Sequence, residues 1–255
     1  MSSADLSKLT AIVYANGRHK SVERLIQSAT RLHPQLRVVV GDDSKQPQPI
    51  AGADPVKMPA GIGVSASRNA LLARVRTPYF LLLEETMELH AGSHVEKMLE
   101  AVASGQCDIA AGDIVGCRRK FGLFTSRTPE PGHATIDATD DALKLTAGAR
   151  PGVGGVLSCD VTHNYFVART DKVRAMGGWD PQLQVDERLE FFVRARRAGI
   201  KVRVCPASIA WRWTDVPVAT PARDFSSLAV AKMGVSRLVD AEGRTFSATA
   251  HSQAA

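Results

Sequence analysis

Acidic side chains stand in pairs directly after two stretches that have the composition of buried strands. Asp42 and Asp43 follow one of these stretches, and Glu84 and Glu85 follow the other. Because open α/β folds bind ligands at the carboxyl ends of their parallel strands, we expect the two pairs to share a cleft. Adjacent carboxylates repel each other, so a cation, often a divalent metal, usually compensates them. The alternative is a solvated loop after each core strand.

A third acidic group lies later in the chain, at the start of a helix-like stretch. Glu187 and Glu190 are three positions apart and therefore share one face of a helix. If this face meets the cleft, one carboxylate could act as a general base on an acceptor hydroxyl. The competing interpretation is that both acids are first-turn residues favoured by the helix macrodipole.

A glycine-rich approach to the helix predicted at 64–75 favours ligand binding there. Gly61 and Gly63 precede small residues in the first turns of the helix, which let backbone approach a neighbour or a ligand closely. Arg68 and Asn69 lie in its first half and could reach a pyrophosphate or a carboxylate. The alternative is that Arg68 pairs with an acid and fixes the helix in place.

The elements that position these residues alternate between strand and helix. Apolar, β-branched runs predict strands, and apolar positions three and four apart predict helices. The predicted strands cover 9–14, 36–40, 55–58, 79–83, 108–115, 161–168, 200–205 and 209–213. The predicted helices cover 20–32, 64–75, 93–103, 169–176, 186–198 and 227–233. This alternation predicts an α/β fold with a mostly parallel central sheet flanked by helices.

The chain of 255 residues is long enough for one large α/β domain with appendages. We expect a disordered N-terminus over 1–8, one domain over 9–216 and a partly disordered C-terminal extension over 217–255. Within the domain, residues 118–155 are rich in Gly, Pro, Thr and charges. This composition predicts a loop-rich insertion with short edge strands, of the kind that forms lids or acceptor loops.

The formal net charge of +6 and the pI of about 9.3 favour anionic partners. A nucleotide, a phospholipid-linked acceptor and nucleic acid all meet this criterion. Much of the excess is local, in the clusters 118–120 and 194–197. Because no aromatic residues interleave beside these clusters, nucleic acid is the weakest of the three options.

No run approaches the roughly 18 apolar residues needed to cross a bilayer, and the first residues lack the pattern of a signal peptide. These features predict a cytoplasmic protein, with peripheral binding at the inner membrane face as the alternative. The cysteines are widely separated, without the spacing of a zinc or redox motif. We expect them to be reduced, buried thiols.

The ordered set of these motifs resembles a known family. Its parts are Tyr14-Ala-Asn16-Gly-Arg18, Val40-Gly-Asp42-Asp43-Ser44, the stretch 63–69, Glu84-Glu85-Thr86, and a Gly-Gly-Trp-Asp turn before an acidic helix. Together they look like an inverting, family-2-like glycosyltransferase of the GT-A fold. The stretch 164–192 is closer still, and it looks like the β-1,4-N-acetylgalactosaminyltransferases that build ganglioside cores. The resemblance covers residues 9 to 213 discontinuously.

The resemblance implies a Rossmann-like GT-A domain that transfers a sugar from a nucleotide-sugar, most plausibly a UDP-sugar, to a hydroxyl of a glycan or lipid-linked glycan. It implies Glu190 or Glu187 as the base, and Mn²⁺ or Mg²⁺ bound at Glu85 and Thr86. The nucleotide-binding residues that it implies are Tyr14, Asn16, Arg18, Asp42, Asp43, Arg68, Asn69 and Glu84. The residues that it implies for acceptor or diphosphate are His163, Trp179 and Arg212.

Two departures from the family pattern bear on the metal. Thr86 stands where the family most often has a carboxylate, and Glu84 and Glu85 replace the shorter Asp, which moves a bound metal by about a bond length. Arg212 lies where many relatives carry a metal-binding histidine, and its charge could balance a diphosphate. His163 is the nearby imidazole, and a lone His is more often structural. A weak-metal or metal-free transferase, a non-catalytic sugar-nucleotide or glycan-binding module, and an enzyme that adds sugar to nucleic acid stay open as alternatives.

Overall fold

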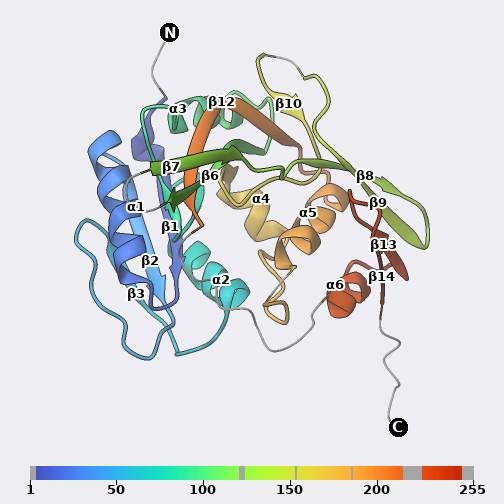
Figure 1. The fold of residues 1–255 in the computed structure, drawn as a ribbon, viewed down its shortest axis with the longest axis horizontal. Helices are drawn as coiled ribbons and strands as arrows, with labels where there is room; N and C mark the ends of the chain where they lie inside the picture. The colour runs from blue at the N-terminus through green and yellow to red at the C-terminus, as the bar shows by residue number, and fades with distance from the viewer. Residues whose placement is uncertain (1–3, 121–123, 153, 185, 215–225, 249–255) are drawn as a thin grey trace.

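The structure of the protein is a computed structural model that describes residues 4–120, 124–152, 154–184, 186–214 and 226–248. Its centre is a ten-stranded sheet whose main path runs β10-β12-β6-β11-β4-β1-β2-β3, with β5 paired to β12 and β7 to β6 (Figure 1). The strands are β1 (Leu9–Ala15), β2 (Arg37–Asp42), β3 (Asp54–Lys57), β4 (Tyr79–Glu84), β5 (Met87–Glu88), β6 (Ile109–Lys120), β7 (Phe124–Pro129), β10 (Leu157–Ser158), β11 (Phe166–Arg169) and β12 (Val202–Trp213).

Strand direction in this sheet brings the predicted acidic ends together. β3, β2, β1 and β4 are parallel neighbours, and the register places Ala15 beside Asp42 and Tyr14 beside Glu84. β11 runs antiparallel between β4 and β6, so the residues just before it lie at the carboxyl end of β4. The predicted α/β fold with a large central sheet and flanking helices is confirmed; the sheet is mixed, because β5, β7, β10 and β11 pair antiparallel with their neighbours.

Helices cover both faces of the sheet because its central strands are apolar on both sides. In β1, Ala11 and Val13 pack with α1 (His19–Leu32) and α3 (Val95–Ala103). Ile12 points to the other face and packs in a core that includes α2 (Val64–Arg74), α4 (Thr170–Ala175) and α5 (Glu187–Arg197). Successive strand residues face opposite sides, which explains how one apolar run supplies two cores.

A second, four-stranded sheet lies beside the first, in the order β14-β13-β9-β8 (Figure 1). Its strands are β8 (Ala134–Ala138), β9 (Ala142–Ala147), β13 (Arg237–Val239) and β14 (Thr245–Ser247), and α6 (Ser226–Lys232) precedes the last two. β9 and β13 pair in parallel, so the predicted insertion and the predicted C-terminal extension build one sheet. We predicted a loop-rich insertion with short edge strands and a partly disordered C-terminal extension. The strands of this sheet give a weak local signal because they are short and partly exposed.

The predicted domain limits stay predictions. The predicted boundary at residue 216, and residues 1–3 and 249–255 of the two predicted tails, lie outside the described residues. The described part of the predicted N-terminal tail contains a short 3₁₀ helix, Leu6–Lys8, which Asp5 caps. All four cysteines are free and buried, as expected. Within the described residues, every helix is too short or too polar to cross a membrane.

Candidate active site

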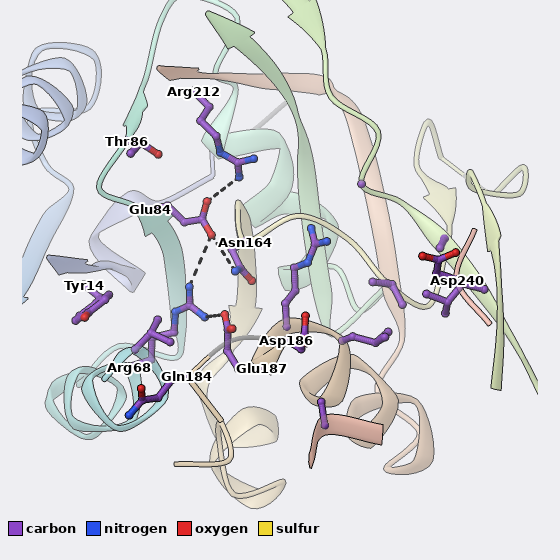
Figure 2. A pocket seen from close by; sticks show the side chains of 18 of the residues that line it. Tyr14, Arg68, Glu84, Thr86, Asn164, Gln184, Asp186, Glu187, Arg212 and Asp240 are labelled. Atoms are coloured by element: carbon purple, nitrogen blue, oxygen red, sulfur yellow. Dashed lines mark hydrogen bonds and ion pairs between the residues drawn. The ribbon is translucent and has the colours of Figure 1, made fainter. Parts of the chain in front are cut away.

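A cavity of about 1060 Å³ lies between the carboxyl ends of the central strands and the second sheet. Figure 2 shows its span, with Tyr14 on one side, Glu84 in the middle and Asp240 on the other side. Ten of the predicted site residues line it: Tyr14, Asn16, Arg18, Asp43, Arg68, Glu84, Glu85, Thr86, Glu187 and Arg212. The other five predicted residues do not line it: Asp42, Asn69, His163, Trp179 and Glu190.

Asp43 forms the corner of the cavity beside the first strand. Its carboxylate accepts hydrogen bonds from the Tyr14 hydroxyl at 3.1 Å, the Asn16 side-chain amide at 2.8 Å and the Gly63 backbone N–H at 3.0 Å. Burial, the largest cause, raises the pKa of Tyr14 to about 12, so the phenol stays a hydrogen-bond donor at neutral pH. Since a carboxylate offers about four acceptor sites, Asp43 retains capacity for one further donor.

Asp42 is buried behind this corner and shapes the loop that follows the first strand. It accepts hydrogen bonds from the backbone N–H of Ser44 at 2.9 Å and of Gly17 at 3.4 Å, and its other oxygen lies 2.9 Å from His19 Nε2. Burial alone would raise its pKa, but these hydrogen bonds outweigh burial and lower it. The two adjacent acids therefore have different positions: Asp43 faces the cavity and Asp42 supports its wall.

Glu85 lies next to this corner and is tied to the same loop. Its carboxylate accepts the backbone N–H of Asn16 at 3.0 Å and pairs with the Arg18 guanidinium. Burial raises the pKa of Glu85 in spite of these two donors. Asn16 thus connects two acids, through its backbone to Glu85 and through its side chain to Asp43.

Glu84 stands at the centre of the cavity, where three side chains converge on it (Figure 2). The carboxylate accepts hydrogen bonds from Asn164 Nδ2 at 2.9 Å and Arg212 Nη2 at 2.6 Å, and it lies 3.7 Å from Arg68 Nη2. Burial opposes ionisation of Glu84, but Arg212 and Arg68 outweigh it, so the pKa of Glu84 is lowered. Glu84 is therefore ionised, and each of its two oxygens accepts a hydrogen bond from a protein side chain.

The floor of the cavity joins α2 to the start of α5. Arg68 Nη1 donates to Glu187 Oε1 at 2.6 Å, and both side chains are buried. Asp186 precedes Glu187, is exposed on the cavity wall, and has the left-handed backbone conformation, with φ of 58°. Arg188 follows and also lines the cavity. Three consecutive charged residues thus face the same space.

Glu190 belongs to a different network, behind the cavity. Its carboxylate pairs with Arg194 one turn later, and Arg194 Nη2 also donates to the Gly178 carbonyl at 2.8 Å. The same turn is held from the other side, because Asn69 exchanges two hydrogen bonds with the backbone of Trp179, at 2.7 and 2.9 Å. The Trp179 ring is buried and stacks on Phe191 with ring centroids 4.8 Å apart. These residues fix the position of α5 rather than contact the cavity.

His163 is buried, and its Nε2–H donates a hydrogen bond to the Glu130 backbone carbonyl at 3.1 Å. Burial lowers the pKa of His163 to about 3, and His133 and Arg212 add to this effect. Because the ring is neutral at physiological pH, it supplies no charge for a diphosphate. His133, which packs edge-on against it at 5.1 Å, is the histidine that lines the cavity.

The structure adds site residues that sequence reasoning missed. Asn164, Asp186 and Arg188 line the middle of the cavity, and residues of the second sheet and α6 close its far side. The apolar part of this far wall consists of Leu145, Ala229, Met233, Leu238 and Phe246, and the polar part is the turn 240–244. Asn164 is the first residue of the stretch 164–192 that carries the family resemblance, so the sequence contained a signal that could have identified it as a site residue. The far wall comes from long-range strand pairing, for which the sequence gives no local signal.

The predicted metal ligands do not form a ready divalent site. Within the described residues, no three His, Cys, Asp or Glu side chains are grouped so that they could hold a metal ion. Glu84 is engaged by Arg212 and Asn164, and Glu85 is engaged by Arg18 and the Asn16 backbone. Mg²⁺ is usually held by one or two carboxylates, with substrate phosphates and waters as its other ligands, and here both candidate carboxylates are already paired with arginines. The side chains in this arrangement therefore do not fit the predicted Mn²⁺ or Mg²⁺.

No protein-family model matches the sequence. Among curated proteins, β-1,4 N-acetylgalactosaminyltransferase 1 of Homo sapiens is 31% identical over 185 residues, which are 69% of this chain and 33% of that protein. β-1,4 N-acetylgalactosaminyltransferase 2 of Mus musculus is 27% identical over 220 residues, which are 84% of this chain and 40% of that protein. The matched region is thus a third to two fifths of these relatives' length.

Two solved structures share the fold. GalNAc-T7, solved with UDP, GalNAc and Mn²⁺, superposes with a TM-score of 0.69 at 13% identity over 89% of this chain and 48% of that one. TarS of S. aureus superposes with a TM-score of 0.58 at 12% identity over 80% of this chain and 60% of that one. The chain thus has a GT-A-like fold, and its sequence is similar to part of the β-1,4-N-acetylgalactosaminyltransferases, which confirms the resemblance predicted from its motifs.

Proposed function

We propose that the protein transfers a sugar from a UDP-sugar to a hydroxyl of a glycan or lipid-linked glycan, with inversion at the anomeric carbon. The observation that carries the proposal is the single cavity in which Asp43, Glu84 and Asp186 meet, although they are far apart in the sequence. Such a cavity at the carboxyl ends of parallel strands is the usual ligand site of open α/β folds.

The uracil end of the donor is assigned to the corner around Asp43. Its carboxylate has one acceptor site beyond those used by Tyr14, Asn16 and Gly63, and a uracil N–H is a donor of the matching kind. Tyr14 also offers a half-buried ring surface beside this site. Asp43 rather than Asp42 is therefore the proposed base-binding acid.

The acceptor is assigned to the far side of the cavity. Phe246, Leu238 and Leu145 form an apolar wall there, on which the C–H face of a sugar ring can pack. Asp240 and Glu242 stand in the adjoining turn and can accept hydrogen bonds from sugar hydroxyls. This mixed wall supports a glycan acceptor over a purely apolar one.

The general base is assigned to the start of α5, and geometry favours Asp186 over the two predicted acids. Glu187 is buried, and its carboxylate is already bound to the Arg68 guanidinium. Glu190 pairs with Arg194 away from the cavity. Asp186 is exposed on the cavity wall, where an acceptor hydroxyl can reach it.

In the proposed reaction, the acceptor oxygen attacks the anomeric carbon from the face opposite the diphosphate. Its proton passes to Asp186 as the new glycosidic bond forms. The bond between the anomeric carbon and the diphosphate breaks, and its electron pair leaves with UDP. Guanidinium groups around Glu84 stabilise the negative charge that develops on the diphosphate oxygen.

Proton NMR of UDP-N-acetylgalactosamine incubated with the protein tests this proposal. Inverting donor hydrolysis releases the β-anomer of the sugar first, before mutarotation, whereas retention releases the α-anomer. We expect Asp186→Asn to slow release by about 10²-fold or more, the range for loss of a general base. Binding of UDP without hydrolysis or transfer to any glycan tested would instead favour a non-catalytic module. Absence of UDP binding would refute the assignment altogether.

A further inference from the structure

Arg188 is a half-buried cation on the cavity wall that the predicted function did not use. Among the residues that the structure describes, none forms a hydrogen bond or an ion pair with its guanidinium. Four charged side chains act on it through space: Glu84, Arg212, Glu187 and Arg68. Burial lowers the pKa of Arg188, and Arg212 and Arg68 contribute to this effect. An anion placed beside Arg188 would relieve both the desolvation and the repulsion.

The neighbouring arginines are already oriented by carboxylates. The two terminal nitrogens of Arg212 pair with Glu84 and Glu130. Arg68 pairs with Glu187 and lies 3.7 Å from the Glu84 carboxylate. Each guanidinium has five N–H donors in a fixed plane, so these pairs leave donors free toward the cavity. The carboxylates thus hold in place two guanidinium groups whose charges act on Arg188.

The same contacts remove the carboxylates that a metal would need. Glu84 receives Arg212 and Asn164, so its oxygens are already engaged. Glu85 forms an ion pair with Arg18. The third position of the acidic motif is Thr86, whose hydroxyl is a neutral ligand. The positive charge that can bind a diphosphate in this cavity is therefore supplied by arginines. The carboxylates that would hold a metal ion are already engaged.

We infer that Arg188, together with Arg212 and Arg68 in the same cavity, binds the diphosphate of the sugar-nucleotide donor in place of a divalent cation. This inference rests on the proposed function and specifies how its donor is held. Arginine suits this role, because its planar fork can donate two parallel hydrogen bonds to phosphate oxygens. It follows that the protein binds UDP in the absence of divalent metal.

Isothermal titration of UDP into the full chain tests the inference, in buffer with EDTA and in buffer with Mn²⁺. We expect the dissociation constants of UDP in the two buffers to agree within about threefold, which corresponds to less than about 1 kcal/mol. Arg188→Gln is expected to weaken UDP in EDTA by about tenfold or more, the loss that accompanies a charged hydrogen bond. Its affinity for uridine, which has no phosphate, is expected to stay unchanged. Arg188→Lys keeps the charge but not the planar guanidinium, so its affinity for UDP in EDTA should lie between those of wild type and Arg188→Gln.

Arg150→Gln is the matched control, because Arg150 is an exposed arginine that forms an ion pair with the surface residue Asp137. It should leave UDP binding unchanged, and thermal melts of all variants show whether they fold. Binding of UDP only with Mn²⁺ would overturn the inference and leave the proposed function standing. Equal UDP affinity of wild type and Arg188→Gln in EDTA would also overturn it. No UDP binding in either buffer would refute the proposed function itself.

Discussion

Arg68 and Glu187 join α2 to α5 through an ion pair of 2.6 Å between residues 119 positions apart. Both side chains are buried at the floor of the cavity, where the pair sets the distance between the two helices. The sequence left open whether Arg68 meets a ligand or an acid. The structure shows an acid, and it shows that this acid also orients the arginine toward the cavity.

Removing one partner of this pair should destabilise the protein strongly. Glu187→Ala leaves the buried Arg68 guanidinium with the more distant Glu84 carboxylate, 3.7 Å away, as its remaining partner, and we expect a loss of about 3 kcal/mol in the free energy of unfolding. Replacement of both partners, Arg68→Met with Glu187→Leu, should cost less than the single change, because no buried charge remains. Urea unfolding of the three proteins measures this. A double variant less stable than Glu187→Ala would contradict the account.

Glu190 should prove structural. Glu190→Gln weakens its pair with Arg194, which holds the turn at Gly178, so we expect a lower melting temperature. Donor hydrolysis measured below that temperature should stay within about threefold of wild type, since the side chain does not line the cavity. A loss of about 10²-fold or more, comparable to that expected for Asp186→Asn, would show instead that Glu190 is the base.

Two neighbouring glycines give a matched pair at the same turn. Gly177 and Gly178 both have positive φ, 91° and 68°, so alanine strains the backbone at either position. At Gly177 an added Cβ meets no atom within 4 Å, whereas at Gly178 it would collide with the side-chain oxygen of Asn69. We expect Gly178→Ala to cost more stability than Gly177→Ala, with each costing about 1 kcal/mol or more from strain alone. Chemical denaturation compares them, and equal losses would argue against the Asn69 contact.

Acid should destabilise the protein through His163. Its pKa is lowered to about 3 in the folded protein, against roughly 6.5 in the unfolded chain, so the unfolded state binds more protons between these values. The stability associated with the neutral ring is therefore complete above pH 6.5 and lost as the pH falls toward 3. At pH 5 the loss is about 2 kcal/mol.

Unfolding measured from pH 8 to pH 4 checks this dependence. His163→Gln, whose amide can still reach the Glu130 carbonyl, should flatten the profile, and the same change at the half-exposed His94 should not. Other groups around His163 are His133, Arg212 and Arg188, and the cations among them keep their charge over this range. An unchanged profile in His163→Gln would assign the acid sensitivity to another group.

The base-binding role of Asp43 predicts a selective loss. Asp43→Asn keeps the size of the side chain but replaces one acceptor oxygen by a donor, so a uracil N–H loses its partner. We expect both UDP and uridine to weaken by about tenfold, the value of one well-placed hydrogen bond. This differs from Arg188→Gln, which should affect UDP alone. Equal affinity for UDP in Asp43→Asn and wild type, by titration, would place the base elsewhere.

Local sequence patterns predicted the half of the site that lies at the carboxyl ends of the central strands. Apolar runs locate β1, β2 and β4, and because parallel strands end at one edge, Asp43, Glu84 and Glu85 had to meet there. The choice between Asp42 and Asp43 depends on which carboxylate the loop hydrogen bonds capture, and composition carries no information on that.

The other half depends on contacts between distant segments. β9 pairs with β13, and this long-range pairing creates the far wall of the cavity from two stretches that look like loops. Arg188 follows two acids in the sequence and lies outside the basic clusters. Its position on the cavity wall could therefore be recognised only in the folded structure. For Glu190 a usable signal did exist, since Arg194 follows it by four positions, the spacing of a helical ion pair.

A crystal structure of the protein with UDP, in the absence of divalent metal, tests the central claim most directly. The account predicts uracil against Asp43 and Tyr14, and the diphosphate between Arg188 and Arg212 in the cavity of Figure 2. UDP bound elsewhere, for example in the hollow beside α1 lined by His19 and Arg24, with that cavity empty, would contradict it.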